Sequence, residues 1–403
     1  MKNIENNILD FLLYGIFLDD NFINKNDINF SNINSFSKIN FSKSEITEKF
    51  EFLIRRYIEN FLKENKNKKI GILLSGGIDS AIILSYLSKS SCPVYAYTWG
   101  GWGENTTDVV FSKISAKKFN VKKHKIIYSK NNYSEEKRSF LKEIKSIKKP
   151  LNYHTAIPYI YLREEILKDG VDIVFNGQNA DTLCMAYPAP VHVYKIDKFF
   201  KFFLLNNLIT PLHLMRIFKS SGCYKYIKPF LNFDYEKRIL KYYKKINCLK
   251  IGKQQKIVAM EEAFTESPYC QNHQKEILES RGIKVYNPYY DESFIKFMIS
   301  LPDYYRKKDN YNKYLFYELA KNRNVPSEII NKPKKGLSYG YTDFLEKKLH
   351  ISIFKEMIQD ENINKFIDVN SIYKKDRNNF FLFDRLRSVY YFLKVNFSSN
   401  KDD

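Results

Sequence analysis

The sequence predicts an α/β fold built on a doubly wound parallel sheet, followed by a helical C-terminal region. Short apolar runs, typical of strands buried on both faces, alternate with helical patterns up to about residue 190. Beyond that point the strand signals fade and helical periodicity continues to the end of the chain. Regular alternation of strands and helices favours parallel strands joined by right-handed crossovers.

The individual elements are expected at defined places. An amphipathic helix should begin near Ser44, where Glu45 and Glu48 give it an acidic first turn. Four strands are expected at residues 70–74, 94–98, 124–127 and 172–175, and helices at 81–87, 107–118 and 156–167. Later helices are expected at residues 257–264, 294–301, 314–319 and 380–397.

The 403 residues suit one large domain or two unequal ones. We expect residues 1–60 to form a helical and linker segment, and residues 61–403 to form the main domain. Within it the sheet should occupy about residues 66–190 and the helical part about 191–403. The most membrane-like stretch, residues 199–218, is interrupted by Lys201, His213 and Arg216, so no membrane span is expected. Two packed helices around Pro211 are favoured over a surface-lying amphipathic helix.

The formal net charge of +21 allows two interpretations. One is a nucleic-acid or other phosphate-rich partner. The other is coding bias, which we favour because the lysines are scattered among Asn and Ile rather than gathered in a stripe. The five cysteines include no C-x-x-C pair, which argues against a disulfide scaffold, a zinc site and an iron–sulfur site. With no signal peptide visible after Met1, a reducing cytoplasm is the expected location.

The strongest chemical feature is a glycine-rich turn between an expected strand and an expected helix. Paired glycines let the backbone approach an anion, and the N-terminus of the following helix offers free N–H groups to phosphate. Ser75 and Ser80 can add hydroxyl donors, whereas Asp79 makes sense beside phosphate only if it holds a metal ion. The turn reads Ser75-Gly76-Gly77-Ile78-Asp79-Ser80.

This turn lacks the Gly-Lys-Ser/Thr of a Walker loop and resembles the S-G-G-x-D-S pyrophosphate loop of the ATP pyrophosphatases. The resemblance implies an adenine-nucleotide α-hydrolase-like fold. It also implies ATP and Mg²⁺ as cofactors, with ATP cleaved between its α and β phosphates. AMP would pass to the substrate, and pyrophosphate would remain in the loop.

Further segments resemble the synthetase half of the asparagine synthetase family, in the same order along the chain. The family's S-G-E-G-A-D, V-P-F-L-D, T-K-Y and R-P-K-x-G segments each have a counterpart, and Ile157-Pro158-Tyr159 resembles a helix start of the family. Together the matches span roughly residues 45–345. The counterparts are Asn176-Gly177-Gln178-Asn179-Ala180-Asp181, Tyr286-Asn287-Pro288-Tyr289-Tyr290-Asp291, Asn312-Lys313-Tyr314 and Asn331-Lys332-Pro333-Lys334-Lys335-Gly336.

The resemblance implies roles for individual residues. Asp181 should be the second magnesium carboxylate, opposite Asp79, and Lys334 should reach the α-phosphate as pyrophosphate leaves. The alternatives are a helix N-cap for Asp181 and a solvated surface lysine for Lys334. The residues that should line the adenosine pocket are Leu74, Thr98 and Gly177.

Two departures from the family matter. Lys2 stands where glutamine-hydrolysing members carry a nucleophilic cysteine, so we expect no glutaminase activity. The nitrogen should then come from free ammonia, a separate amidotransferase subunit or an amine substrate. Gln178 stands where the family has Glu and the related β-lactam synthetases have Tyr. A neutral amide cannot take a proton from an attacking amine. Either the proton goes to pyrophosphate or to a tyrosine such as Tyr153 or Tyr187, or the nucleophile arrives differently.

The expected function is ATP-dependent amide formation through an acyl-adenylate, on a small-molecule or peptide carboxylate. One rival is a sulfur-transferring tRNA-modifying enzyme, which would suit the basic charge but usually needs paired cysteines. Cys184 is the nearest thiol to the site segments, and packing is its expected role. The other rival is a non-catalytic member of the fold, against which the intact Asp79, Asp181 and Lys334 argue.

Overall fold

The structure is a computed structural model that describes most of the chain. It covers residues 42–101, 106–130, 132–184, 266–306, 313–332 and 347–397, with the isolated positions 5, 7–9, 11–12, 226, 251, 255–256, 258–259 and 262. The stretch 199–218, Tyr187 and Lys334 lie outside the described residues.

Five parallel strands form one sheet in the order β3-β2-β1-β4-β5. The chain runs outward from β1 through β2 to β3, then crosses back to β4 on the other side of β1. This reversal is the switch point of a doubly wound sheet, and it confirms the predicted fold class. The strands are β1 (Ile70–Leu73), β2 (Val94–Gly101), β3 (Lys123–Tyr128), β4 (Ile173–Phe175) and β5 (Lys284–Tyr286).

The fifth strand lies far outside residues 66–190, where the sequence predicted the sheet. It pairs with β4 through Ile173↔Lys284 and Phe175↔Tyr286. Its three residues, at the edge of the sheet, are only half-buried or exposed. A segment this short and polar has no apolar run, so its pairing is decided by the contact with β4 rather than by local pattern.

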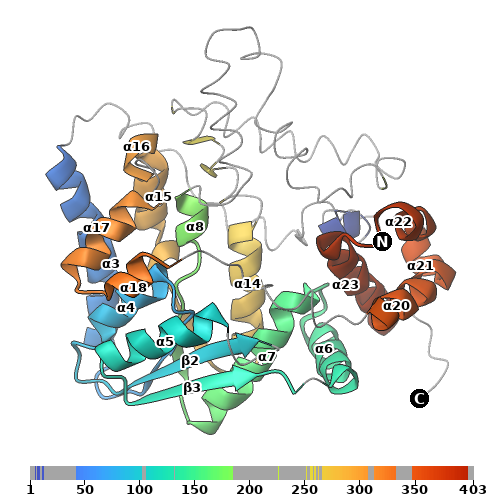
Figure 1. Cartoon of the computed structure of the whole chain (residues 1–403), viewed down its shortest axis with the longest axis horizontal. Coiled ribbons are helices and arrows are strands. Elements are labelled where there is room, and N and C mark those ends of the chain that lie inside the picture. Colours follow the sequence, from blue (N-terminus) through green and yellow to red (C-terminus); the bar gives the residue numbers. More distant parts are fainter. Residues whose placement is uncertain are drawn as a thin grey trace, which may run out of the picture.

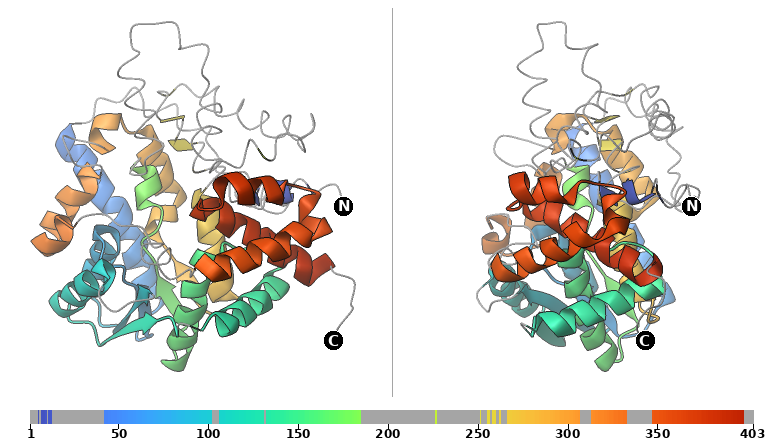
Figure 2. Two further views of the ribbon diagram at one scale, coloured as in Figure 1. Left: turned by 45° about the vertical axis from the view of Figure 1, so that its right-hand side comes forward. Right: turned by 90° about the vertical axis from the view of Figure 1, so that its right-hand side faces the viewer.

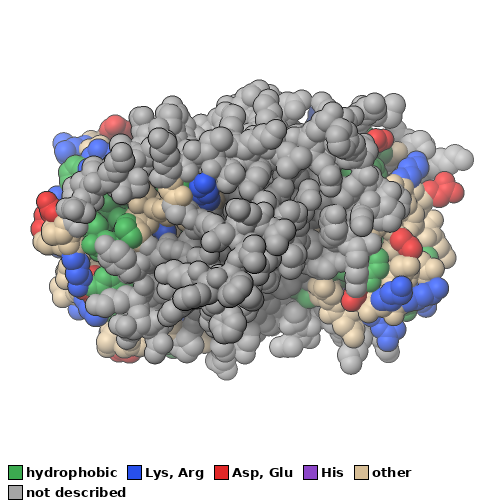
Figure 3. Space-filling view, turned by 90° about the horizontal axis from the view of Figure 1, so that it is seen from above, with side chains coloured by type: hydrophobic (Ala, Val, Ile, Leu, Met, Phe, Trp, Pro, Cys, Tyr) green, Lys and Arg blue, Asp and Glu red, His purple; other side chains and the backbone are tan. Residues whose placement is uncertain are grey.

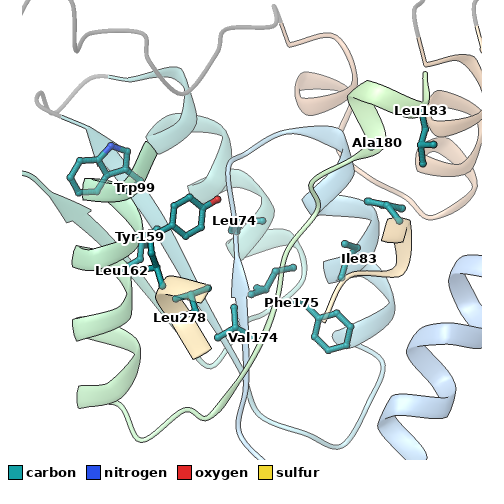
Figure 4. Close-up of a cluster of buried hydrophobic side chains, with 14 of the residues drawn as sticks. Leu74, Ile83, Trp99, Tyr159, Leu162, Val174, Phe175, Ala180, Leu183 and Leu278 are labelled. Carbon is teal, nitrogen blue, oxygen red and sulfur yellow. The ribbon is translucent and has the colours of Figure 1, made fainter. Parts of the chain in front are cut away.

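Helices cover both faces of the sheet (Figure 1). One face carries α3 (Lys43–Glu64), α4 (Ile78–Leu87) and α5 (Thr107–Lys118), and the other carries α7 (Tyr153–Lys168) and α14 (Glu266–Glu279). Helix α6 (Tyr133–Ile147) packs beside α7. Figure 4 shows how buried side chains from the helices meet those of the strands. Leu162 of α7 and Leu278 of α14 lie near Val174 of β4, while Ile83 of α4 lies near Phe175.

Helix starts follow local capping chemistry. Helix α3 has a complete capping box, in which the Ser42 hydroxyl accepts from the Glu45 backbone and the Glu45 carboxylate accepts from the Ser42 backbone. The cap is therefore Ser42 rather than the predicted Ser44. Helix α5 begins after Thr106, whose side chain accepts from Val109 N–H. The predicted bounds 107–118 are confirmed for this helix.

The later helices confirm the predicted helical C-terminal region. Helix α17 packs against α3 and α4, and α23 packs against α6 and α7 (Figure 2). The predicted helix 380–397 matches α23 at both ends. These elements are α8 (Ala180–Leu183), η3 (Pro288–Tyr290), α15 (Glu292–Ser300), α16 (Asp303–Arg306), α17 (Tyr314–Asn322), α18 (Ser327–Ile330), α20 (Lys347–Gln359), α21 (Glu361–Asn364), α22 (Val369–Asp376) and α23 (Phe380–Phe397).

Basic side chains are interspersed with acidic ones where the surface can be described. Viewed from above, Lys and Arg lie beside Asp and Glu at both ends of the molecule (Figure 3). Exposed lysines commonly pair with carboxylates, as Lys130 does with Glu135 and Lys168 with Glu165. Among the described helices, none is both long and apolar enough to cross a membrane.

A buried polar cluster joins α23 to α7. Asp384 of α23 is fully buried, and its carboxylate accepts from His154 Nδ1–H at 2.5 Å and from Arg387 Nη2 at 2.5 Å. The Arg387 guanidinium lies 3.8 Å from the centre of the Tyr153 ring. Burial alone would raise the pKa of Asp384, but His154 and Arg387 outweigh it and lower the pKa to about 2. The charged carboxylate therefore holds the last helix against the helix that leads into β4.

Asp384→Asn should destabilise the protein by about 3–5 kcal/mol, because it leaves Arg387 buried without its counter-ion. Urea unfolding at pH 7 measures this loss, and Asp172→Asn, at an exposed position, is the control. Because the pKa is lowered from 3.8, this stabilisation is present above pH 4 and is lost as the pH falls toward 2. A loss similar to that of Asp172→Asn would show that the cluster is not needed for stability.

Candidate active site

The site begins where β1 ends. Leu74 N–H donates to Tyr97 O at 2.8 Å, which extends the pairing of β1 with β2 by one residue. The Thr98 hydroxyl donates to Leu74 O at 2.7 Å and lies 2.9 Å from His124 Nε2. Because the hydroxyl has a single hydrogen, His124 Nε2–H is the donor of the second bond. Leu74 and Thr98 side chains are both buried, and Leu74 lies within the core (Figure 4).

The loop that follows contains two glycines in different surroundings. Gly76 has a φ of +65°, and a Cβ there would lie 2.6 Å from Ser112 N and 2.8 Å from Phe111 Cβ. Gly77 is the N-cap of α4 and has no side chain to accept from the first N–H groups of the helix. Ser75 Oγ and Ser80 Oγ lie 3.4 Å apart beside it. An uncapped helix start flanked by hydroxyls is suited to binding an anion.

The loop after β4 lies directly against this helix start. A Cβ on Gly177 would lie 2.9 Å from Ser80 N and 3.2 Å from Asp79 C, so only glycine allows this approach. Strands β1 and β4 are neighbours in the sheet, with Ile72 opposite Phe175. The two loops therefore meet at the switch point, where open α/β sheets bind ligands.

A network of amides fixes the β4 loop. Asn287 Nδ2 donates to Asn176 Oδ1 at 2.6 Å and to Gln178 O at 3.0 Å. Gln178 Nε2 lies 3.3 Å from the Tyr159 hydroxyl. The tyrosine beside Gln178 is thus Tyr159, whereas Tyr153 is fully buried with its hydroxyl 3.4 Å from Glu136 Oε2. The proposal that Tyr153 receives a proton is not supported by this placement.

Asn179 occupies the position where the family pattern has its second glycine. Its φ of +79° lies in the left-handed region, which Asn tolerates better than most residues. Its amide donates to Tyr289 O at 2.9 Å and to Glu262 Oε2 at 3.2 Å. Asn179 is also the N-cap residue of α8, so Asp181 is not the cap of this helix.

Asp79 and Asp181 meet around a single lysine. Lys313 Nζ lies 2.6 Å from Asp79 Oδ2 and 2.6 Å from Asp181 Oδ1. Burial would lower the pKa of Lys313, but the two carboxylates outweigh it and raise the pKa above its ordinary 10.5. Lys313 belongs to the Asn312-Lys313-Tyr314 segment noted in the sequence, and its partners emerge only in the fold.

The donor set at this point fits a magnesium ion bound together with phosphate. Because both carboxylate oxygens lie 2.6 Å from one nitrogen, they are at most twice that distance apart. Mg²⁺ in nucleotide sites typically takes one or two carboxylates, with phosphate oxygens and water completing the octahedron. Among the described residues no group of three or more His, Cys, Asp or Glu side chains converges.

A second lysine reaches the loop from the late helices. Lys332, just after α18, contacts Asp108 Oδ1 at 2.6 Å and donates to Ser75 O at 3.2 Å. Burial raises the pKa of Asp108, and Lys332 opposes that shift. The sequence predicts a catalytic role for Lys334 and none for Lys332. Lys334 lies two residues beyond this contact, outside the described residues, so its role stays a prediction.

Cys184, at the end of α8, is the thiol nearest these carboxylates in the described part of the chain. It is buried, and burial raises the pKa of the thiol to about 12. A neutral buried thiol is a packing group rather than a nucleophile.

Comparison with known sequences agrees with this geometry. A sequence model described as asparagine synthase matches residues 63–380, which is most of the chain. The chain belongs to the asparagine synthase family. It is also 31% identical over 160 residues to "Putative asparagine synthetase (glutamine-hydrolyzing) 1" of Methanocaldococcus jannaschii. That alignment covers 39% of this chain and 29% of the relative, so it spans less than a third of the relative's length.

The matched range includes both loops of the switch point, Lys313 and Lys332. It begins after the predicted N-terminal segment and ends at the first residue of α23.

The left-handed backbone at Asn179 predicts that a residue with a Cβ and no side-chain amide will destabilise the loop. Asn179→Gly and Asn179→Ala both remove the amide bonds, but only alanine places a Cβ in the left-handed region. We expect Asn179→Ala to be less stable than Asn179→Gly by about 1–2 kcal/mol in urea unfolding. Equal stabilities would show that the backbone of this loop relaxes and that the glycine of the family pattern is not required here.

Proposed function

We propose that the chain is a carbon–nitrogen ligase that activates a carboxylate as its acyl-adenylate, releases pyrophosphate, and transfers the acyl group to ammonia or an amine. The observation that carries this proposal is the meeting of Asp79 and Asp181 beside an uncapped helix start at the switch point. Membership of the asparagine synthase family supports the same chemistry.

The phosphates of ATP are expected against the start of α4. The backbone N–H groups of the first turn and the hydroxyls of Ser75 and Ser80 would hold them. Asp79 and Asp181 would hold Mg²⁺, whose charge stabilises the departing pyrophosphate. The substrate carboxylate would attack the α-phosphorus, and the bond between the α-phosphorus and the bridging oxygen would break. AMP would leave when the nucleophile attacks the acyl carbon.

We place the incoming nucleophile beside Gln178, whose printed side-chain partner is the uncharged Tyr159 hydroxyl. The Gln178 amide contacts the Tyr159 hydroxyl, and both groups can orient a substrate by hydrogen bonds. Neither is a base at neutral pH. We therefore propose that the chain adenylates its carboxylate readily and transfers it to ammonia poorly, so that asparagine is not its main product.

The sulfur-transfer alternative has no supporting observation in the described site. That chemistry needs a reactive thiolate, and the pKa of Cys184 is raised to about 12 by burial.

Asp79→Asn and Asp181→Asn should each lower pyrophosphate release by about 100-fold or more, because a catalytic metal ion contributes several kcal/mol to transition-state stabilisation. Radiolabelled ATP and a panel of candidate carboxylates, at saturating Mg²⁺, give the measurement. Each variant leaves Lys313 one carboxylate partner, so the fold should persist, as circular dichroism can check.

Asp169→Asn is the matched control for these variants. Asp169 is also an ion-paired carboxylate, since it contacts Lys123 Nζ at 2.8 Å and Lys125 Nζ at 2.9 Å. It follows the C-terminal end of α7 and precedes β4, so it lies at the end of the strands opposite to the loops. Normal pyrophosphate release by Asp79→Asn or Asp181→Asn, with the control also normal, would mean that the metal lies elsewhere.

Gln178→Glu should raise ammonia-dependent amide formation by about 100-fold, the typical minimum contribution of a general base. The assay supplies aspartate, ammonia and ATP, and follows asparagine and AMP separately. Gln178→Ala controls for the loss of the bond to Tyr159, and it should not raise turnover. Efficient asparagine synthesis by the unmutated chain, without improvement in Gln178→Glu, would contradict the proposed role of this position.

A further inference from the structure

The lysine between the two proposed metal ligands is the feature that the proposed function leaves unexplained. Lys313 reaches Asp79 and Asp181 with the same nitrogen, at 2.6 Å from each. Its side chain is only 8% exposed, and those of Asp79 and Asp181 are 17% and 23% exposed. The ammonium therefore fills the point on which the two carboxylates converge.

A cation at this point is required by the fold. Asp79 lies on α4 after β1, and Asp181 lies on α8 after β4, so the switch point itself brings the two carboxylates together. Two carboxylates held this close repel each other unless a positive charge lies between them. Lys313, from the N-cap position of α17, supplies that charge.

Lys313 and Mg²⁺ compete for the same oxygen atoms. Magnesium binds carboxylate oxygens at about 2.0–2.1 Å, whereas the ammonium holds them from 2.6 Å. Both cations cannot occupy the point between Asp79 and Asp181. If a metal ion entered alone, the displaced ammonium and the metal would leave a net positive charge in a largely buried site. The phosphates of ATP would remove that excess charge.

We propose that Lys313 is the resident counter-ion of the metal site, holding Asp79 and Asp181 together until Mg²⁺ arrives with a nucleotide. This inference rests on the proposed function, because it takes the two carboxylates as metal ligands. The metal enters as its complex with ATP, and binding of metal and of nucleotide is strongly coupled.

The test uses Mn²⁺ as the probe and measures free Mn²⁺ by electron paramagnetic resonance. Titrations are made with and without α,β-methylene-ATP, in which the bond cleaved in the proposed reaction is blocked. The unmutated protein should bind Mn²⁺ at least about tenfold more weakly without the nucleotide than with it, a coupling of ordinary size. Lys313→Met should bind Mn²⁺ without nucleotide at least about tenfold more tightly than the unmutated protein does.

Two further variants keep the test decisive. Lys313→Gln preserves an N–H donor for one carboxylate while removing the charge, so it should behave as Lys313→Met even if the methionine variant folds poorly. Lys125→Met is the matched control, because Lys125 also joins two carboxylates, Glu165 at 3.0 Å and Asp169 at 2.9 Å. It should leave Mn²⁺ binding unchanged.

The outcomes separate this inference from the proposed function. Nucleotide-free Mn²⁺ binding that is as tight in the unmutated protein as in both Lys313 variants would overturn the role of Lys313. Absence of Mn²⁺ binding in every variant, even with α,β-methylene-ATP present, would overturn the metal site and the proposed function with it.

Discussion

The repulsion between two carboxylates at one point of the sheet is the constraint around which this site is organised. Because β1 and β4 are parallel neighbours, the loops that follow them leave the same edge of the sheet. Asp79 and Asp181 lie at the starts of the helices that follow those loops, and they converge. A positive charge must lie between them, and Lys313 supplies it from the start of α17.

Because this positive charge comes from Lys313, the helices that follow β5 are part of the site. Helix α17 packs on α3 and α4, which brings Lys313 to Asp79 at the start of α4. Lys332, after α18, contacts Asp108 and the backbone of Ser75 on the other side of the loop. Asn287, before η3, holds the backbone of Gln178. Segments more than a hundred residues beyond β4 thus fix the loops that follow β1 and β4.

The β4 loop uses amides where related enzymes use a carboxylate and a glycine. Gln178 replaces the expected Glu, and Asn179 replaces the second glycine of the pattern. The Asn179 replacement is tolerated because Asn adopts left-handed backbone, and its side chain gains bonds to Tyr289 O and Glu262. The replacement at Gln178 places a neutral amide where the family pattern has a carboxylate, and an amide cannot act as a base.

The sequence by itself determined the features that depend on neighbouring residues. The apolar runs of β1, β2, β3 and β4 identified four strands, and the bounds of α5 and α23 followed from helical periodicity. The glycine turn and the order of motifs identified the family. These signals are local. A run of adjacent apolar residues indicates a strand buried on both faces, and adjacent glycines indicate a tight turn.

Only the tertiary structure decided which distant side chains meet. In the fold, the three-residue β5 pairs with β4, and Tyr159 rather than Tyr153 lies beside Gln178. Lys313 lies between Asp79 and Asp181. Each of these contacts joins segments that are distant in sequence or lie on opposite sides of a crossover. Their partners are chosen by the order of the strands and the packing of the helices, and by the cost of leaving buried charge unpaired, so no pattern in adjacent residues encodes them.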